Sequence, residues 1–555
     1  MNKLVIVLFI SCFLLAHQDL NAQSTPVGLP TMDDYLRRQQ LLGDSSVKAS
    51  LMLRPLHSTS EGFKGTELHL MPLVWKQQYV TDHPLSINDG AMIPARGYQT
   101  MLSTGFFARW GILSAQLMPE LVFAENRDFD GFPDEHYFVI WDRYNSYKGT
   151  IDLPERFGDE AYRRVFWGQS NVRLSYKAVS LGLSNENLWW GPGQKNALMM
   201  TNNAPGFKHL TFNSTRPLNT PVGSFEWQVV SGRLDESGFP GLDTAALAAR
   251  TLKPREKPSS WRYINGITVN YQPRWLPGLS LGAARAYTLY GESLKKYGIR
   301  TWLPVFESFL KDKTGIQSAD TLASDQVASA WVRWLMPDDH AEVYLEFGRS
   351  DHSWHLNDFL LEPGHGRAYI LGYRKLVPLS KGRGDYLDIH LELTQFSMNV
   401  PTYLRTQKGY SMWYNHYGVS QGYTHEGQIL GAGIGTSSNM QLLNIAWVRG
   451  RKRVGLELYR LNHDQDLWSN LRWDGYFDHR THWVDISGAL VADWNYRNFL
   501  VNVKLQTVAV HNYMFLYDPI PTEPPYLWDV GKTRYNVNAE LSLVYQFRPF
   551  KTKNK

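Results

Sequence analysis

Aromatic and histidine side chains gather late in the chain, in the segment that runs from Tyr410 to His425. Aromatic rings stack on the apolar faces of sugars, while imidazole and amide groups satisfy sugar hydroxyls, so this mixture suits carbohydrate binding. Glycines interrupt the segment and strand alternation is missing, which favours a loop over an interfacial aromatic belt. Packing within such a loop is an equally good explanation. The candidate polysaccharide-binding residues are Trp413, Tyr414, His416, Tyr417, Tyr423 and His425.

A second unusual segment follows a strand-like stretch nearer the N-terminus and begins with two adjacent tryptophans. A Gly-Pro-Gly turn relieves the backbone and a pair of asparagines follows, so large rings and amide donors are held at a strand end. Two interpretations stay open: a structural plug or girdle element, and a binding element that faces sugar. The motif residues are Trp189, Trp190, Gly191, Pro192, Gly193, Asn202, Asn203 and Pro205.

The acidic segment from Asp128 to Asp134 offers oxygen atoms at alternate positions, as a calcium-binding loop does. It lacks the remaining ligands and the closing bidentate glutamate of such a loop, which favours a solvated acidic turn. The chain also carries no His-Glu-x-x-His, no Gly-x-Ser-x-Gly and no phosphate-binding loop. A glycosidase needs two carboxylates at a defined separation, which a sequence does not show. We therefore expect neither an enzyme nor a bound metal or cofactor.

The tryptophan motif resembles the signature of the capsule-assembly Wzi family, in which Trp-Trp-Gly-Pro-Gly is followed by Asn-Asn-Ala-Pro. The later stretch from Gly422 to Gly431 is similar to a Gly-Tyr-x-x-x-Gly-x-x-Leu-Gly segment of that family. The resemblance implies an outer-membrane β-barrel of about 18 strands with a small helical element at its periplasmic end. It also implies a lectin-like role in capsule assembly.

Alternation of apolar and polar residues indicates the strands that must position these segments. In the last strand, Val537, Ala539 and Leu541 share one face, while Asn538 and Glu540 share the other. The pattern recurs along nearly the whole chain in segments of about ten residues, which predicts an all-β fold, a transmembrane antiparallel β-barrel. Long polar segments rich in glycine and proline lie between strand pairs, and we expect them outside the cell or folded into the lumen.

Composition agrees with a barrel that has one wet face. Aromatic residues make up 14% of the 555 residues, yet the mean hydropathy is −0.36, which excludes a bundle of transmembrane helices. The formal net charge of +5 permits an anionic polymer as partner but does not argue for one, and no nucleic acid is expected.

The N-terminus predicts export. Residues 1–22 have the charged start, short apolar run and small-residue cleavage site of a secretory signal peptide. The single cysteine, Cys12, lies inside the apolar run, which disfavours acylation. Cleavage of the signal peptide would remove Cys12 and leave a mature chain without thiols. Residues 23–50 are expected to form a linker and a short helix, in which Thr31 caps and Gly43 ends the helix. Residues 51–555 are expected to form the barrel, located in the outer membrane.

The interpretation that joins these observations is an outer-membrane barrel that binds capsular or other surface polysaccharide and helps its assembly or attachment. Many weak contacts to a repeating polymer give avidity without a deep site. A porin for small solutes or oligosaccharides is the main alternative, followed by a surface glycan hydrolase and a barrel that binds a partner protein. The expected partners are polysaccharide and outer-membrane lipid, and the expected state is a monomer.

Overall fold

The computed structural model describes residues 24–44, 47, 49–57, 66–295, 302, 305, 324–350, 360, 364, 366–380, 382–397, 412–473, 481–517 and 533–547. The expected signal peptide, Cys12 and the basic tail at 551–555 lie outside the described residues, as do Tyr410 and much of the longest expected loops.

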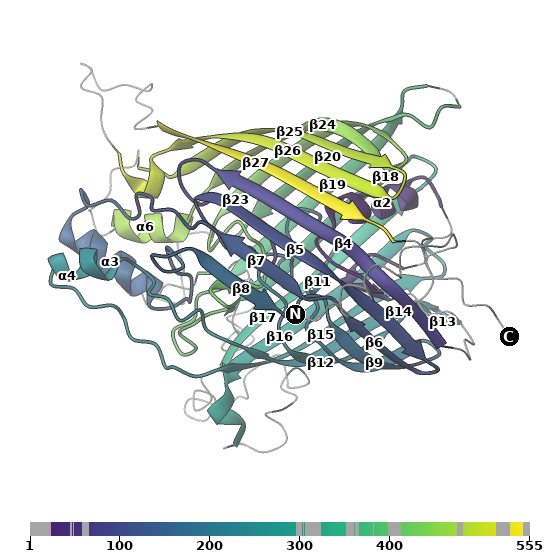
Figure 1. Cartoon of the computed structure of the whole chain (residues 1–555), viewed down its shortest axis with the longest axis horizontal. Coiled ribbons are helices and arrows are strands. Elements are labelled where there is room, and N and C mark those ends of the chain that lie inside the picture. The colour runs from purple at the N-terminus through teal and green to yellow at the C-terminus, as the bar shows by residue number, and fades with distance from the viewer. Residues whose placement is uncertain are drawn as a thin grey trace, which may run out of the picture.

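The described residues form a closed antiparallel barrel of 18 strands, which confirms the predicted fold. Figure 1 shows β27 lying beside β4, so the last strand closes the barrel on the first. Three of the 18 strands are interrupted and therefore carry two labels each. β6 and β7 form one strand, because both pair with β5, and β8 and β9 form the next, because they pair with β7 and β6. β12 and β13 form the third, because both pair with β14. The barrel strands are β4 (Thr66–Val80), β5 (Gly97–Trp110), β6 (Leu113–Leu117), β7 (Glu120–Ala124), β8 (Tyr162–Phe166), β9 (Asn171–Tyr176), β10 (Val179–Ser184), β12 (His209–Ser214), β13 (Leu218–Thr220), β14 (Gly223–Leu234), β15 (Arg262–Pro273), β16 (Leu279–Tyr290), β17 (Ser324–Met336), β18 (Ala341–Ser350), β19 (Arg367–Pro378), β20 (Tyr386–Gln395), β23 (Asn439–Arg449), β24 (Lys452–Asn462), β25 (Val484–Tyr496), β26 (Phe499–His511) and β27 (Thr533–Tyr545).

Burial along the strands is the reverse of that in a soluble sandwich. On β26, Val503 and Leu505 are 42% and 50% exposed, whereas Gln506 is 2% exposed. The neighbouring β27 likewise buries Asn538 and exposes Val537. An apolar outer surface around a buried polar interior is the arrangement that lipid outside and a filled lumen inside require. The described residues contain no helix long and apolar enough to cross a membrane.

The two ends of the barrel differ in the length of their connections. Only Lys177 and Ala178 separate β9 from β10, and only Gly450 and Arg451 separate β23 from β24. Lys177 and Gly450 have φ angles of 54° and 55°, as tight hairpin turns require. Short turns mark the periplasmic end of such barrels, so the long connections at the opposite end are extracellular. Figure 1 shows α3 (Phe138–Lys148), α4 (Thr244–Ala249) and α6 (Gln465–Trp473) at the extracellular end.

The expected N-terminal helix is present as α2 (Pro30–Leu41), and it lies at the short-turn end. The expected cap was wrong. The helix begins at Pro30, and the residue at its cap position is Leu29, which has no polar side chain to cap it. Thr31 therefore lies inside the first turn, where its hydroxyl donates to Asp493 on β25, at 3.1 Å. Gly43, with a φ angle of 75°, is the second residue after the helix, the position at which a left-handed glycine commonly ends a helix.

The hydrophobic core of the protein lies inside the lumen. Three connections fold inward, and we call residues 82–96, 185–208 and 412–438 the plug. The main buried cluster brings Trp190 and Leu198 of the second segment against Trp413 and Tyr414 of the third. The remaining short elements are three strand pairs and two 3-10 helices: β1 (Ser24–Thr25) with β3 (Leu56–His57), β11 (Trp189–Trp190) with β2 (Leu53–Arg54), β21 (Thr424–His425) with β22 (Gln428–Ile429), η1 (Gly291–Lys295) and η4 (Tyr513–Phe515).

Candidate functional site

The tryptophan motif packs the plug against the barrel wall. Trp190 is fully buried, its indole Nε1 donates to Gln228 Oε1 at 2.9 Å, and its ring lies so close to Gly266 that a Cβ there would approach the ring to 2.9 Å. Trp189 lies under the guanidinium of Arg54, 4.5 Å from the ring centroid. These contacts are those of the plug interpretation, and they leave neither ring on an exposed surface.

The rest of the motif loop is held by two glutamates on strands. Glu392 of β20 is 1% exposed, and its carboxylate accepts hydrogen bonds from the backbone N–H groups of Gln194, Lys195 and Asn196, the shortest at 2.7 Å. Glu346 of β18 accepts from the N–H of Leu198 at 3.3 Å. In the sequence, such glutamates belong only to the polar face of an alternating strand, and their role in fixing the loop has no local signal.

A glycine and two asparagines of the tryptophan motif also make contacts within the plug. Gly191 has a φ angle of 119°, and a Cβ there would lie 2.8 Å from Glu346 Oε2. The Asn202 amide donates to the carbonyl of Asn88, and the Asn203 amide donates to the carbonyl of Ile429, at 2.9 and 3.0 Å. The two asparagines therefore join all three plug segments, and the adjoining Gly193 and Pro205 are also buried. Pro192 lies in the same buried turn.

The late aromatic segment is divided between the plug core and the surface. Trp413, Tyr414 and Tyr423 are at most 1% exposed. The Tyr414 hydroxyl donates to the carbonyl of Leu198 and accepts from the N–H of Ala432, both at 2.9 Å. Buried packing thus occupies these three rings, and their contact with polysaccharide stays a prediction.

The remaining predicted residues of that segment differ in accessibility. His425 is buried, and its Nδ1 accepts from the N–H of Asp235 at 3.0 Å. Burial lowers the pKa of His425 to about 3, against the opposing effect of the Asp235 carboxylate. His416 lies beside Thr150, just beyond α3, and its Nδ1 accepts from Val419. Tyr417 is 92% exposed at this extracellular end, so it alone of the six presents a whole ring to solvent.

A cavity of about 720 Å³ opens at the extracellular end between α3 and α4. The acidic segment from Asp128 to Glu135 forms one wall, and the segment around Glu155 to Asp159 forms another. Its volume falls within the range of about 300–1,000 Å³ that is usual for ligand pockets. We call this cavity the outer pocket. Sequence had identified the acidic turn, but only the fold places it opposite the other wall.

Aromatic rings pack against one another in the walls of the outer pocket. Phe132 stacks on Tyr144 with ring centroids 4.0 Å apart and meets the edge of Trp141 at 5.0 Å. The carboxylate of Glu155 accepts from the N–H of Phe132 at 2.6 Å, and burial raises the pKa of Glu155. The exposed rings of Tyr137 and Phe138, 73% and 56% accessible, continue the surface beyond the pocket. These rings were not among the predicted site residues.

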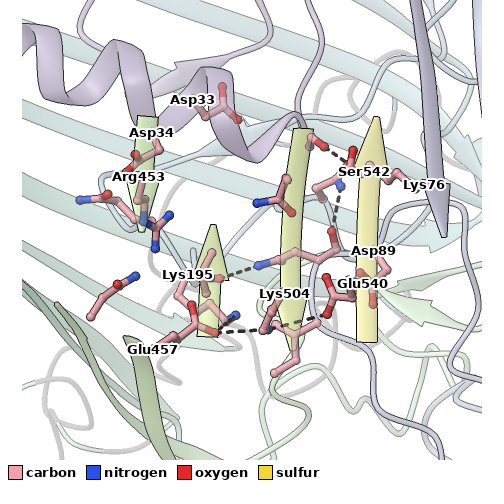
Figure 2. Close-up of a pocket in the computed structure, with 18 of the residues that line it drawn as sticks. Asp33, Asp34, Lys76, Asp89, Lys195, Arg453, Glu457, Lys504, Glu540 and Ser542 are labelled. Atoms are coloured by element: carbon pink, nitrogen blue, oxygen red, sulfur yellow. Dashed lines mark hydrogen bonds and ion pairs between the residues drawn. The ribbon is translucent and has the colours of Figure 1, made fainter. Parts of the chain in front are cut away.

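A second cavity, of about 260 Å³, lies in the lumen beside α2. Figure 2 shows cations and anions facing one another across it. Glu457 pairs with Lys195 and with Lys504, each at 3.3 Å, and Lys504 also pairs with Glu540 at 3.7 Å. These ion pairs attach the plug residue Lys195 to the wall through Glu457 of β24, which also pairs with Lys504 of β26. The described part of the chain holds no group of three or more His, Cys, Asp or Glu placed to bind a metal.

The family model for the capsule assembly protein Wzi matches residues 76–501. The chain belongs to the Wzi capsule assembly family. This confirms the resemblance drawn from the two motifs, and it places the barrel in the outer membrane. No curated protein sequence matches the chain.

One solved structure shares the fold of this chain, and others are similar at lower TM-scores. Wzi of Escherichia coli, an outer-membrane protein involved in group 1 capsule assembly and described as a carbohydrate-binding β-barrel, aligns with a TM-score of 0.57 and 13% identity, covering 95% of this chain and 100% of its own. OccAB1 of Acinetobacter baumannii aligns at 0.40 with 8% identity, covering 87% and 98%. OccK7 of Pseudomonas aeruginosa aligns at 0.39 with 10% identity, covering 87% and 99%.

Proposed function

We propose that this Wzi-family barrel binds capsular or related surface polysaccharide at its extracellular end and holds it at the cell surface. The observation that carries the proposal is the outer pocket, a preformed cavity of about 720 Å³ on the extracellular side of a barrel whose lumen is packed. The carbohydrate binding described for the Escherichia coli relative supports the same class of ligand.

The exposed rings near the pocket give the polymer additional places to stack. Tyr137 and Phe138 lie at the start of α3. Tyr417 lies near the other end of the helix, because the neighbouring His416 donates its backbone N–H to Thr150, just beyond α3. Rings at both ends of an 11-residue helix, about 16 Å long, can engage successive sugars of one chain. Several weak contacts then raise retention through avidity. The role is attachment without catalysis, by a monomer whose outer wall contacts lipid.

Binding to the polysaccharide of the protein's own host tests this proposal. The detergent-purified protein should give saturable binding by isothermal titration calorimetry. Combining Tyr137→Ala with Tyr417→Ala should weaken it by between about fivefold and about 150-fold, since each aromatic stack contributes about 0.5–1.5 kcal/mol. Tyr496→Ala is the matched control, because that ring is 62% exposed at a periplasmic turn. Absence of binding, together with steady single-channel conductance in a planar bilayer, would instead establish the porin alternative.

A further inference from the structure

The outer pocket has a charge unlike that of the chain as a whole. Seven carboxyl groups line it against two guanidinium groups, Arg156 and Arg534, although the whole chain carries a net charge of +5. The acidic character is therefore local, and it belongs to the walls that a ligand in this cavity would touch.

The arginines around the pocket neutralise only part of this charge. Asp130 pairs with Arg534 at 3.2 Å, and Arg156 is shared between Asp128 and Asp159, at 3.1 and 3.4 Å. All three aspartates remain at least 84% exposed in their side chains, so they face the pocket's solvent as well as their partners.

The other carboxyl groups add to the excess. Arg250 pairs with Asp134 at 2.9 Å, which leaves Glu135 beside it at the exposed rim. The Asp243 carboxylate accepts the N–H of Ala245, as the cap of α4. Burial raises the pKa of Glu155, which makes it the group that adds least charge. The mouth of the pocket is thus negative.

A cavity lined mainly by one sign of charge concentrates its electrostatic potential and discriminates ligands by their own charge. A glycan with carboxylates, phosphates or sulfates is repelled, whereas protonated amino groups gain attraction and hydrogen bonds to aspartate. We infer that the outer pocket binds a stretch of polysaccharide that bears no negative charge, and that it prefers sugars with protonated amino groups. The inference rests on the proposed function, because it names the class of glycan that this pocket takes.

Three tetrasaccharides that differ in charge test the preference: oligomers of glucosamine, N-acetylglucosamine and galacturonate. Calorimetry at low salt and at a pH that keeps the amine protonated should rank glucosamine first and galacturonate last. Each exposed ion pair contributes up to about fivefold. Glucosamine should therefore exceed N-acetylglucosamine by about five- to twentyfold, and added salt should shrink the difference. Galacturonate binding as tightly as glucosamine overturns the inference.

Variants place the effect in the pocket. Asp130→Asn combined with Asp159→Asn should reduce glucosamine affinity about five- to twentyfold and leave N-acetylglucosamine affinity within about twofold. Asp338→Asn is the matched control, since this exposed aspartate lies on the periplasmic turn between β17 and β18. An equal loss in the control means adsorption elsewhere and overturns the inference.

The host polysaccharide is titrated in parallel. If it binds without the expected charge order, the inference alone fails. If neither it nor any tetrasaccharide binds, the proposed function fails as well.

Discussion

Arg37 of α2 and Glu342 of β18 form a buried ion pair, in which the guanidinium Nε donates to both carboxylate oxygens at 2.9 and 3.1 Å. The two residues lie 305 positions apart in the chain. Glu342 also accepts from Arg333 of β17 at 2.7 Å, and α2 is attached further by Arg374, which pairs with Asp34. The N-terminal helix is therefore fixed to the barrel wall by charge, at the mouth that faces the periplasm.

Arg37→Ala should loosen this attachment without unfolding the barrel. Glu342 keeps Arg333 as a partner, so the loss should be about 1–3 kcal/mol, the value of a hydrogen bond to a charged group, and not the larger loss that follows when a buried charge is left alone. We expect a lower urea midpoint and brief conductance events in planar bilayers. Arg274→Ala, at an exposed turn of the same end, is the control. A silent bilayer and an unchanged midpoint would show that α2 is held without this pair.

Glu392→Gln should release the motif loop from β20. The carboxylate accepts three backbone N–H groups, and an amide offers one acceptor oxygen and places its own N–H groups against those donors. We expect faster hydrogen exchange at Gln194, Lys195 and Asn196, and a loss of about 2–4 kcal/mol in the free energy that keeps the loop closed. Glu160→Gln, an exposed change in an extracellular loop, is the comparison. Unchanged exchange at these amides would mean that the loop is held by its apolar side chains alone.

The barrel could be predicted because its signal is local. Alternation such as Val503 and Leu505 against Gln506 needs only neighbouring residues, and a lipid-facing strand must show it. The resemblance then supplied the strand number and the helix at the periplasmic end. The expected cap of that helix was wrong because the helix begins at Pro30, before Thr31, and the Thr31 hydroxyl bonds to Asp493, a residue 462 positions away that no local pattern reveals.

The plug could not be predicted in detail for the same reason. Tyr414 bonds to Leu198 across 216 residues, and the aromatic segment looks alike whether its rings face sugar or a core. Tyr417 is exposed to solvent and Tyr414 is buried, and this difference depends on which other loops pack beside each residue. Glu392 lies on a regular strand, so its function as an acceptor for loop amides appears only when the loop is folded against it.

Gly266→Ala should disturb the Trp190 contact. A Cβ at Gly266 would stand 2.9 Å from the indole Cη2, which is closer than van der Waals contact allows, and the ring is also fixed by Gln228. We expect a loss of about 1–3 kcal/mol from overpacking, measured as a shift in the urea midpoint with tryptophan fluorescence. Gly488→Ala on β25 is the matched change, because its Cβ would meet Leu458 at an ordinary 3.6 Å. Equal midpoints for the two variants would refute tight packing at Trp190.

Asp89 should make the plug sensitive to pH. Burial, with a further contribution from Glu540, raises the pKa of this carboxyl from 3.8 to about 6. The native state therefore keeps a proton that the unfolded state releases between about pH 4 and 6, so stability falls as the pH rises through this window. Above it, the buried charge destabilises the fold, by about 3 kcal/mol at most. Asp89 accepts a hydrogen bond from the Ser86 hydroxyl at 2.7 Å, and asparagine retains an oxygen for that bond.

Asp89→Asn should accordingly match the wild type near pH 4 and exceed it in stability near pH 7. Urea midpoints of the refolded barrel are measured for both proteins at intervals from pH 4 to pH 8. The difference in midpoint between variant and wild type isolates the effect of Asp89, because the other titrating groups contribute equally to both proteins. Asp338→Asn, which changes an exposed carboxylate at a turn, should give a difference that stays flat with pH. A flat difference for Asp89→Asn as well would show that this carboxyl is ionised at no cost within the plug.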